Sequence, residues 1–156
     1  MKGFAVRDTI SGKGVFADRQ FAKGTVLFPF TGPVLPESAL PTPYATAEDH
    51  YIQVGPKRFM GPSGGIDDLV NHSCDPNAGL VFRSDRIDIV AIRDIPAGEE
   101  IAFDYSTTMR DDPWTMRCAC GSPTCRGVVA EFARLPDDVK KRYLELGIVP
   151  SYVTRP

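Results

Sequence analysis

The sequence predicts a mostly β protein with small helical insertions and one helix near its C-terminal end. Fourteen glycines and fourteen prolines are spread over 156 residues, which favours short strands joined by many turns. Apolar residues alternate with polar ones in several short segments, as expected for half-buried strands. Only the segment 136–146 combines a helical spacing of apolar residues with helix start and stop signals. Because the sequence contains no internal repeat and no linker, we expect one compact unit.

Eight short strands are expected, each bounded by turn-forming residues. They are 3–7, 14–17, 25–30, 51–54, 57–60, 79–83, 86–93 and 100–103. The first two flank the turn Ser11-Gly12-Lys13, and the fourth and fifth flank Gly55-Pro56 and are expected to form a hairpin. The seventh shows the clearest alternation, with Ile87 and Ile89 on one face.

Proline content and helix signals distinguish the remaining segments. Five prolines between Pro29 and Pro43 are incompatible with a helix or a central strand, so an irregular surface segment is expected there. Residues 66–70 are expected to form one helical turn. In 136–146, two aspartates lie in the first turn, where carboxylates interact favourably with the helix dipole, and a glycine follows the last turn. The apolar face of this helix carries Val139, Tyr143 and Leu146.

Composition and charge argue against several classes of protein. The chain has 18 basic and 20 acidic residues, and its formal net charge of −2 provides no basic field for non-specific binding of nucleic acid. No apolar run is as long as a membrane span. Residues 1–7 are too few and too soon charged to resemble a secretory signal peptide. We therefore expect an intracellular protein, cytoplasmic or nuclear, in a reducing compartment.

The four cysteines are spaced like metal ligands rather than disulfide partners. Cys118, Cys120 and Cys125 lie close together in the sequence, and three thiolates at this spacing can surround one face of a tetrahedral zinc ion. A structural zinc site needs four ligands, and Cys74 is the only other cysteine. The alternative is a set of reduced, half-buried cysteines that bind no metal.

Three further motifs are each weak when taken alone. Residues 71–77 read N-H-S-C-D-P-N, which is compatible with a simple polar turn. Residues 98–105 read G-E-E-I-A-F-D-Y, which is compatible with a strand that ends in a structural tyrosine. Residues 11–16 read S-G-K-G-V-F, and the two glycines allow either a tight hairpin turn or a close approach of the backbone to a ligand.

The order of these motifs is more specific than any one of them. A glycine turn, then N-H-S-C-x-P-N, then E-E-I-x-F-D-Y, then C-x-C-x-x-x-x-C-R-G resembles the SET-domain methyltransferases that carry a post-SET zinc motif. The resemblance runs from about Gly12 to Gly127. It implies several short sheets with a knot-like crossing of two chain segments. It also implies a catalytic part at 1–109, a zinc segment at 110–129 and a helical tail at 130–156, all within one compact unit.

The resemblance further implies that the chain binds S-adenosylmethionine, which leaves as S-adenosylhomocysteine, and one structural zinc ion. The residues expected at the cofactor are Gly12, Lys13, Gly14, Val15, Phe16, Asn71, His72, Tyr105 and Val128. Of these, Asn71 and His72 are expected beside the adenine and ribose, where the two segments cross. The zinc ligands implied are Cys74, Cys118, Cys120 and Cys125, which agrees with the cysteine count.

The implied reaction is the transfer of methyl groups to the ε-amine of a lysine in a protein or peptide, histones being one candidate class. Tyr105, Tyr51 and Phe103 are the expected catalytic residues, lining a channel for the lysine. The attacking amine must be neutral, but the pKa of a free lysine is about 10.4. An aromatic channel lowers that pKa because it removes water from the ammonium form. Phenylalanine at position 103 implies room for two or three methyl groups.

Two other functions remain compatible with the sequence. The first is a catalytically inactive SET fold that binds peptide or cofactor without turnover. The second is a zinc-dependent nucleic-acid-binding domain, which needs a basic face, although only Arg117 and Arg126 flank the cysteines. We predict no direct contact with nucleic acid and no membrane association, and the oligomeric state is left open. The chain departs from the family at Asp68, where many relatives carry a basic residue.

Overall fold

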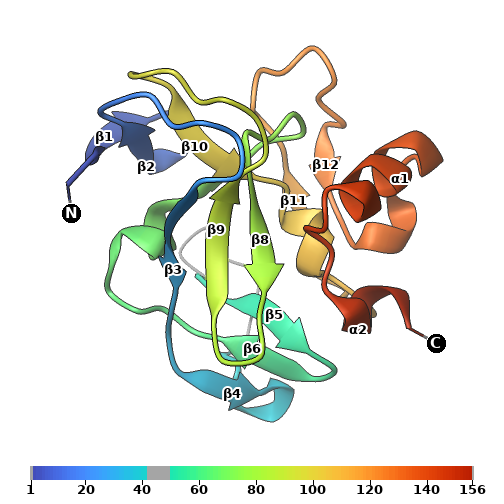
Figure 1. Ribbon diagram of the computed structural model, residues 1–156. Coiled ribbons are helices and arrows are strands. Elements are labelled where there is room, and N and C mark those ends of the chain that lie inside the picture. Colours follow the sequence, from blue (N-terminus) through green and yellow to red (C-terminus); the bar gives the residue numbers. More distant parts are fainter. Residues whose placement is uncertain (1, 42–49, 156) are drawn as a thin grey trace.

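The computed structural model describes residues 2–41 and 50–155, and within these ranges the strands form four small sheets (Figure 1). The first sheet has the order β1 (Phe4–Thr9), β2 (Gly12–Ala17), β10 (Glu100–Phe103), β7 (Asn71–His72). The second has the order β3 (Val26–Phe30), β9 (Ile87–Ala91), β8 (Ala78–Phe82). The third has the order β4 (Val34–Pro36), β6 (Arg58–Met60), β5 (Ile52–Gly55), and the fourth pairs β11 (Met116–Arg117) with β12 (Val128–Val129).

The helices are short and most lie between strands or near the C-terminal end. The 3-10 helices are η1 (Glu37–Ala39), η2 (Ile66–Leu69), η3 (Tyr105–Thr108) and η4 (Phe132–Arg134), and the α-helices are α1 (Asp137–Glu145) and α2 (Ser151–Thr154). The α-helices lie on the opposite side of the molecule from the hairpin β1–β2 (Figure 1). This architecture confirms the predicted fold class. None of the described helices is long and apolar enough to cross a membrane.

Most expected strands are present, with small shifts at their ends. β1 and β2 pair antiparallel with Thr9 opposite Gly12, so β2 begins two residues earlier than the sequence predicts. Gly12 has a φ of +103°, a conformation that side chains disfavour and glycine adopts readily. β5 and β6 form the predicted antiparallel hairpin. The turn predicted at 66–70 is the 3-10 helix η2.

The proline-rich stretch is more regular than the sequence predicts. Its described part contains β4 and η1, so the prediction of an irregular segment was wrong in part. β3, which contains Pro29, and β4, which contains Pro36, are both edge strands of three-stranded sheets. Edge strands tolerate proline because one of their sides makes no ladder hydrogen bonds. The rest of the stretch, residues 42–49, lies outside the described residues.

The main core is formed by inward-facing residues of the first two sheets. Val15 and Ile101 oppose each other on β2 and β10, and both are fully buried. Leu80 and Ile89 oppose each other on β8 and β9 and are also fully buried. Ile87 is buried on the same face, which confirms the face predicted for this strand. This core fixes the position of β10, on which the candidate site is built.

Two segments far apart in the sequence meet where β7 pairs parallel with β10. Asn71 is aligned with Ala102, and His72 with Phe103. The pairing continues beyond β7, since the Ser73 N–H donates to the carbonyl oxygen of Phe103 at 3.1 Å. The N-H-S-C and F-D-Y motifs, some thirty residues apart in the chain, therefore lie side by side.

An acidic pair shapes the loop that leads into β7. Asp68 accepts hydrogen bonds from the N–H groups of Ser63 and Gly64, at 3.0 and 2.7 Å. The adjacent Asp67 is buried and accepts from the N–H and the hydroxyl of Thr31. These carboxylates organise the loop before η2, at a place where the family resemblance implies a basic residue.

The C-terminal segment packs through a second apolar cluster. Tyr143 of α1 and Ile148, just beyond it, are buried in this cluster together with Ile92, Phe132 and Leu135. A Cβ atom at Gly79 of β8 would lie 2.4 Å from Cγ2 of Ile148, so glycine at this position makes room for the segment. The predicted apolar face of α1 is confirmed, since Tyr143 is buried in this cluster and Val139 and Leu146 pack against it. α2 was not predicted.

The carboxylate of Asp88 is buried between two arginines at the end of the β8–β9 hairpin. Arg83 Nε and Arg86 Nε donate to Asp88 Oδ2 at 2.6 and 3.0 Å. The side chain of Asp88 is 3% exposed. The hydrogen bond from Arg83 outweighs the effect of burial and lowers the pKa of Asp88 below its usual value.

We therefore predict that Asp88→Asn lowers the free energy of unfolding by roughly 1–2 kcal/mol at neutral pH. Because the pKa of Asp88 is lowered in the folded state, the stabilisation is present above the unfolded pKa of about 3.9 and is lost as the pH falls below it. Urea unfolding of both proteins between pH 3 and 7 measures this, with the exposed Asp85→Asn as the control. A difference that does not shrink in acid would contradict the assignment.

Candidate active site and metal centre

The four cysteines expected as zinc ligands lie together. Their Sγ atoms are all within 4.8 Å of one another, and those of Cys74 and Cys118 are 3.7 Å apart. A zinc ion held tetrahedrally at a Zn–S distance of about 2.3 Å separates its sulfur ligands by about 3.8 Å. The donor set and its spacing therefore fit one zinc ion. One ligand directly follows the N-H-S motif, and the other three come from the zinc segment, residues 110–129.

Among the four sulfur atoms, the surroundings lower the pKa of Cys120, whereas burial raises the pKa values of Cys74 and Cys118. The N–H of Arg126 points at Sγ of Cys74 at 3.4 Å. Burial opposes ionisation of Cys120, but hydrogen bonds from backbone N–H groups and from Cys118 and Cys125 lower its pKa to about 7. Because zinc binds the thiolate form, binding of the ion would release the remaining thiol protons.

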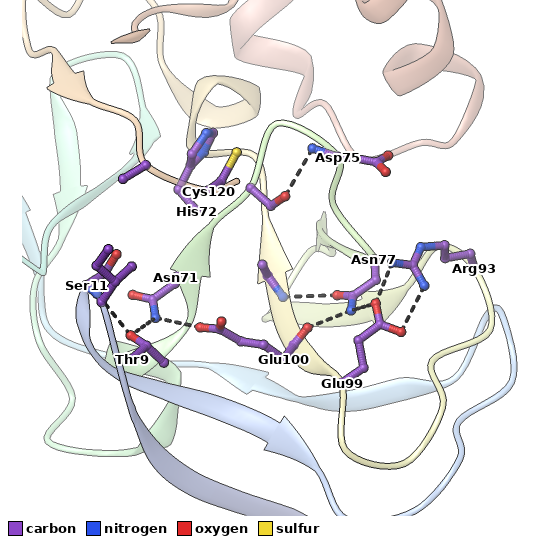
Figure 2. Close-up of a pocket in the computed structure, with 14 residues that line it drawn as sticks. Thr9, Ser11, Asn71, His72, Asp75, Asn77, Arg93, Glu99, Glu100 and Cys120 are labelled. Carbon is purple, nitrogen blue, oxygen red and sulfur yellow. Dashed lines mark hydrogen bonds and ion pairs between the residues drawn. The ribbon is translucent and has the colours of Figure 1, made fainter. Parts of the chain in front are cut away.

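A half-open pocket of about 220 Å³ lies beside the β7–β10 pair (Figure 2). Its walls come from the tip of the β1–β2 hairpin, from β7 and the loop after it, from β10 and the residues before it, and from the zinc segment. The lining residues are Thr9, Ile10, Ser11, Asn71, His72, Ser73, Asp75, Asn77, Arg93, Glu99, Glu100, Ala102, Ala119 and Cys120. A zinc ligand therefore forms part of the pocket wall.

The side-chain amide of Asn71 is oriented by three acceptors, of which Figure 2 shows those on Thr9 and Glu100. Its Nδ2 donates to Glu100 Oε1 at 2.7 Å and to the carbonyl oxygen of Lys13 at 3.0 Å, with a longer contact to Thr9 Oγ1 at 3.5 Å. Because only the nitrogen of an amide donates, these acceptors fix its orientation and leave Oδ1 to accept from a ligand. Gly14 permits this arrangement, since a Cβ there would lie 2.3 Å from Glu100 Oε1.

His72 connects the cysteine cluster to the F-D-Y segment. Its Nδ1 accepts a hydrogen bond from the backbone N–H of Tyr105 at 3.2 Å. Burial lowers the pKa of His72 to about 4, so the imidazole is neutral and its proton resides on Nε2. Nε2 lies 3.3 Å from Sγ of Cys74 and is therefore the donor to that sulfur. The orientation of this ring thus depends on a metal ligand at one nitrogen and on the Tyr105 backbone at the other.

Two of the three aromatic residues expected at the lysine channel, Phe103 and Tyr105, have neighbouring rings. The rings of Phe103 and Tyr105 have centroids 4.8 Å apart, and Trp114 of the zinc segment lies 6.5 Å from Tyr105. The hydroxyl of Tyr105 donates to the carbonyl oxygen of Val70 at 2.8 Å. Burial, and then repulsion from Glu100, raises the pKa of Tyr105, which keeps the phenol protonated. Tyr51 lies beside Gly61, where a Cβ would approach its Cε1 within 3.1 Å.

The structure places the other expected cofactor residues outside the pocket lining. Asn71 and His72 line it, whereas the remaining ones do not: Gly12, Lys13, Gly14, Val15, Phe16, Tyr105 and Val128. Val15 is fully buried in the main core, the ring of Phe16 lies under the guanidinium of Arg7, and Val128 on β12 is 49% exposed. Lys13 and Gly14 affect the lining only through Asn71. The carbonyl oxygen of Lys13 accepts a hydrogen bond from its amide, and Gly14 leaves room for that amide and for Glu100.

Several lining residues were not anticipated from the sequence. Thr9, Ile10 and Ser11 precede the glycine turn and look like an ordinary hairpin tip in the sequence. Ile10 is 89% exposed, which is unusual for an isoleucine beside a pocket and is visible only in three dimensions. Glu100 lies inside the E-E-I-x-F-D-Y motif, but its contact with Asn71 depends on the pairing of β7 with β10.

A family model described as the SET domain matches residues 12–106, more than half of the chain. The chain belongs to the SET-domain family. The matched residues of this SET domain include the glycine turn, β7 and β10, so the pocket described above is built largely from the part that defines the family. The zinc segment and the helices α1 and α2 follow that part.

Named relatives are longer proteins. Histone-lysine N-methyltransferase trr of Drosophila melanogaster is 31% identical over 134 residues, which are 79% of this chain and 6% of the fly protein. The H3 lysine-4 specific histone-lysine N-methyltransferase of Saccharomyces cerevisiae is 44% identical over 69 residues, 41% of this chain and 6% of the yeast protein. The aligned part of this chain therefore spans only a small part of the length of these relatives.

Solved structures share the fold of this SET domain. The methyltransferase domain of human histone-lysine N-methyltransferase SETMAR superposes with a TM-score of 0.66 at 24% identity, over 82% of this chain and 58% of that chain. KRYPTONITE in complex with mCHG DNA and SAH gives a TM-score of 0.66 at 18% identity, over 81% of this chain and 29% of that chain. At these identities the likeness establishes the fold alone.

We predict that removal of zinc unfolds the zinc segment and leaves the core of the SET domain folded. The free energy of binding a structural zinc ion is also folding free energy for the segment that it organises. Hydrogen exchange after chelation should show lost amide protection in 110–129 and retained protection in β8 and β9. Unchanged protection of 110–129 in protein shown by metal analysis to be free of zinc would contradict the prediction.

Proposed function

We propose that this SET domain transfers methyl groups from S-adenosylmethionine to the ε-amine of a lysine in a protein substrate. The observation that carries the proposal is the pocket beside the β7–β10 pair. It presents oriented acceptors for a cationic ligand, is walled in part by the zinc segment, and adjoins the aromatic pair Phe103 and Tyr105 through His72. The sequences of histone-lysine N-methyltransferases with which it aligns support the same reaction.

The polar groups of the pocket fit the cofactor. S-adenosylmethionine carries an activated methyl group on a positive sulfonium, together with an ammonium group and an adenosine. Oδ1 of Asn71 and the carboxylate of Glu100 can accept from the ammonium, and the exposed side chain of Ile10 can cover an apolar part of the ligand. The pocket, at about 220 Å³, is smaller than most ligand pockets, so part of the molecule would face solvent.

The residues of the chain prepare the lysine rather than activate the methyl group. The hydroxyl of Tyr105 donates a hydrogen bond to the carbonyl oxygen of Val70, so the lone pairs of its oxygen remain free to accept. They can accept weak C–H···O contacts from the methyl group and a contact from the lysine amine, which orients its nitrogen for attack. Its raised pKa argues against a phenolate acting as general base. The aromatic surroundings lower the pKa of the lysine by desolvation and tolerate a methylated ammonium product by cation–π attraction.

Phe103 supports the proposal that more than one methyl group fits. Its side chain is 1% exposed and packs between Phe30 and Tyr105, with ring centroids 6.1 and 4.8 Å away. A phenyl ring offers no hydroxyl that could hold a water molecule beside the amine. We therefore propose a product with two or three methyl groups, with Tyr51 as a further wall of the channel.

The proposed partner is a lysine-bearing protein or peptide. A fold neighbour, KRYPTONITE, is described in complex with mCHH DNA, H3(1-15) peptide and SAH, at 17% identity and a TM-score of 0.65. The peptide in that complex supports a histone-like substrate. The net charge of −2 on this chain argues against direct binding of DNA. The relatives, histone methyltransferases by name, support a nuclear location in a eukaryotic source. For a bacterial source we propose the cytoplasm.

The alternative is a SET fold that binds cofactor and peptide without turnover. The protonated Tyr105 hydroxyl, oriented toward Val70 and beside Phe103, favours the enzyme, because a binding module has no need of an oriented hydroxyl at this position. A zinc-dependent nucleic-acid-binding domain is disfavoured by the acidic balance of the chain.

Methyl transfer tests the proposal directly. Zinc-loaded protein incubated with methyl-labelled S-adenosylmethionine and histones should label lysine, and Tyr105→Phe should lower kcat by about a hundredfold because one oriented polar group is lost. Mass spectrometry of the product gives the number of methyl groups. Transfer by the variant at the wild-type rate would contradict the role of Tyr105.

Affinity for S-adenosylhomocysteine distinguishes an enzyme from a module that binds the cofactor without turnover. Tyr105 does not line the pocket, so Tyr105→Phe should bind this product within about threefold of wild type. A wild-type protein that binds S-adenosylhomocysteine but methylates no lysine in a broad set of basic proteins would favour the binding module. Lost binding in the variant would instead mean that Tyr105 acts on the cofactor.

A further inference from the structure

Asp104 connects three parts of the chain through one buried carboxylate. The residue is fully buried and lies between Phe103 and Tyr105 in the sequence. Its Oδ1 accepts from the N–H of Ser106 at 3.1 Å and so caps η3, the 3-10 helix that begins with Tyr105. Nη2 of Arg126 lies 2.9 Å from Oδ1 and 2.8 Å from Oδ2.

Arg126 is the link from this carboxylate to the metal centre. It directly follows the zinc ligand Cys125, and its backbone N–H points at Sγ of another ligand, Cys74. Its side chain is 17% exposed, although most residues around it in the zinc segment are exposed or half-buried. The ion pair with Asp104 is therefore one of the few buried anchors between the zinc segment and the rest of the fold.

A third hydrogen-bond donor to Asp104 comes from helix α1. The hydroxyl of Tyr143 in α1 donates to Asp104 Oδ2 at 2.9 Å, and Tyr143 is fully buried. Its ring packs in the second apolar cluster with Ile148 and Phe132, so the hydroxyl is held at a fixed position. Removing this donor would leave the carboxylate free to turn away from Arg126, because Oδ2 would lose a partner that is rigidly placed.

We infer that Tyr143 is a positioning residue for the metal centre: its hydroxyl fixes the Asp104 carboxylate, which in turn holds Arg126 and the zinc segment. α1 lies outside residues 12–106, which the family model matches. The contact that supports the zinc segment therefore comes from a helix that follows the matched part of the chain. The inference rests on the proposed zinc site but not on methyl transfer.

Zinc release distinguishes this role from ordinary packing. Tyr143→Phe keeps the buried ring and removes only the hydroxyl, and the rate of zinc transfer to the chelating dye 4-(2-pyridylazo)resorcinol should rise about tenfold. The matched control is Tyr152→Phe in α2. The hydroxyl of Tyr152 lies 2.6 and 2.7 Å from the carbonyl oxygens of Gln53 and Thr108, which share its one proton, and its hydrogen bonds do not involve Asp104. The control should destabilise the fold yet release zinc at the wild-type rate.

A double-mutant cycle tests the path through Arg126. If the hydroxyl acts through the Asp104–Arg126 pair, Tyr143→Phe should raise zinc release less than twofold in an Arg126→Gln background. Additive effects, or equal release by Tyr143→Phe and Tyr152→Phe at matched stability, would overturn the inference. Wild-type protein that holds no zinc would overturn the metal site together with it. Zinc release that follows the expected pattern in protein without methyltransferase activity would leave the inference standing while the proposed function fails.

Discussion

The parallel pairing of β7 with β10 is the constraint on which the rest of the site depends. It places Asn71 and His72 beside Ala102 and Phe103, although the two strands are some thirty residues apart in the chain. Two contacts of the site depend on it directly: the amide of Asn71 reaches Glu100, and Nδ1 of His72 reaches the backbone of Tyr105. A parallel pair needs a long connection, and here the connection contains the cysteine-cluster member Cys74 and the strands β8 and β9, which contribute Leu80 and Ile89 to the main core.

The metal centre extends this constraint to the C-terminal part of the chain. Cys74 follows β7 directly, so zinc bound to it and to the zinc segment brings that segment over the pocket, where Ala119 and Cys120 form part of the wall. His72 is held between Sγ of Cys74 and the Tyr105 backbone. His72 therefore connects the cysteine cluster, the pocket that it lines and the aromatic pair Phe103 and Tyr105, and on the proposed assignment disorder of this ring would affect all three.

Sequence patterns predicted eight of the twelve described strands, the hairpin at β5–β6 and the cysteine cluster, because these depend on local alternation, turn residues and ligand count. The two-residue strands β7, β11 and β12 are too short to show an alternation and were not predicted. The patterns did not predict β4, since proline content alone does not show which strand of a sheet lies at its edge. They also did not predict Ile10 and Ser11 at the pocket, because a hairpin tip carries no signal for what it faces. The partners of Asp104 were not predicted for the same reason: Ser106 is two residues away, but Arg126 and Tyr143 lie 22 and 39 residues away.

Titration calorimetry with S-adenosylhomocysteine tests most directly whether the pocket at the β7–β10 pair is the cofactor site. Zinc-loaded wild-type protein is predicted to bind one molecule per chain. Gly14→Ala should weaken binding at least tenfold, because its Cβ would lie 2.3 Å from Glu100 Oε1 and 3.0 Å from Asn71 Nδ2 and must displace the oriented amide. Absence of binding by the wild type, or equal affinity of a folded Gly14→Ala variant, would contradict the account.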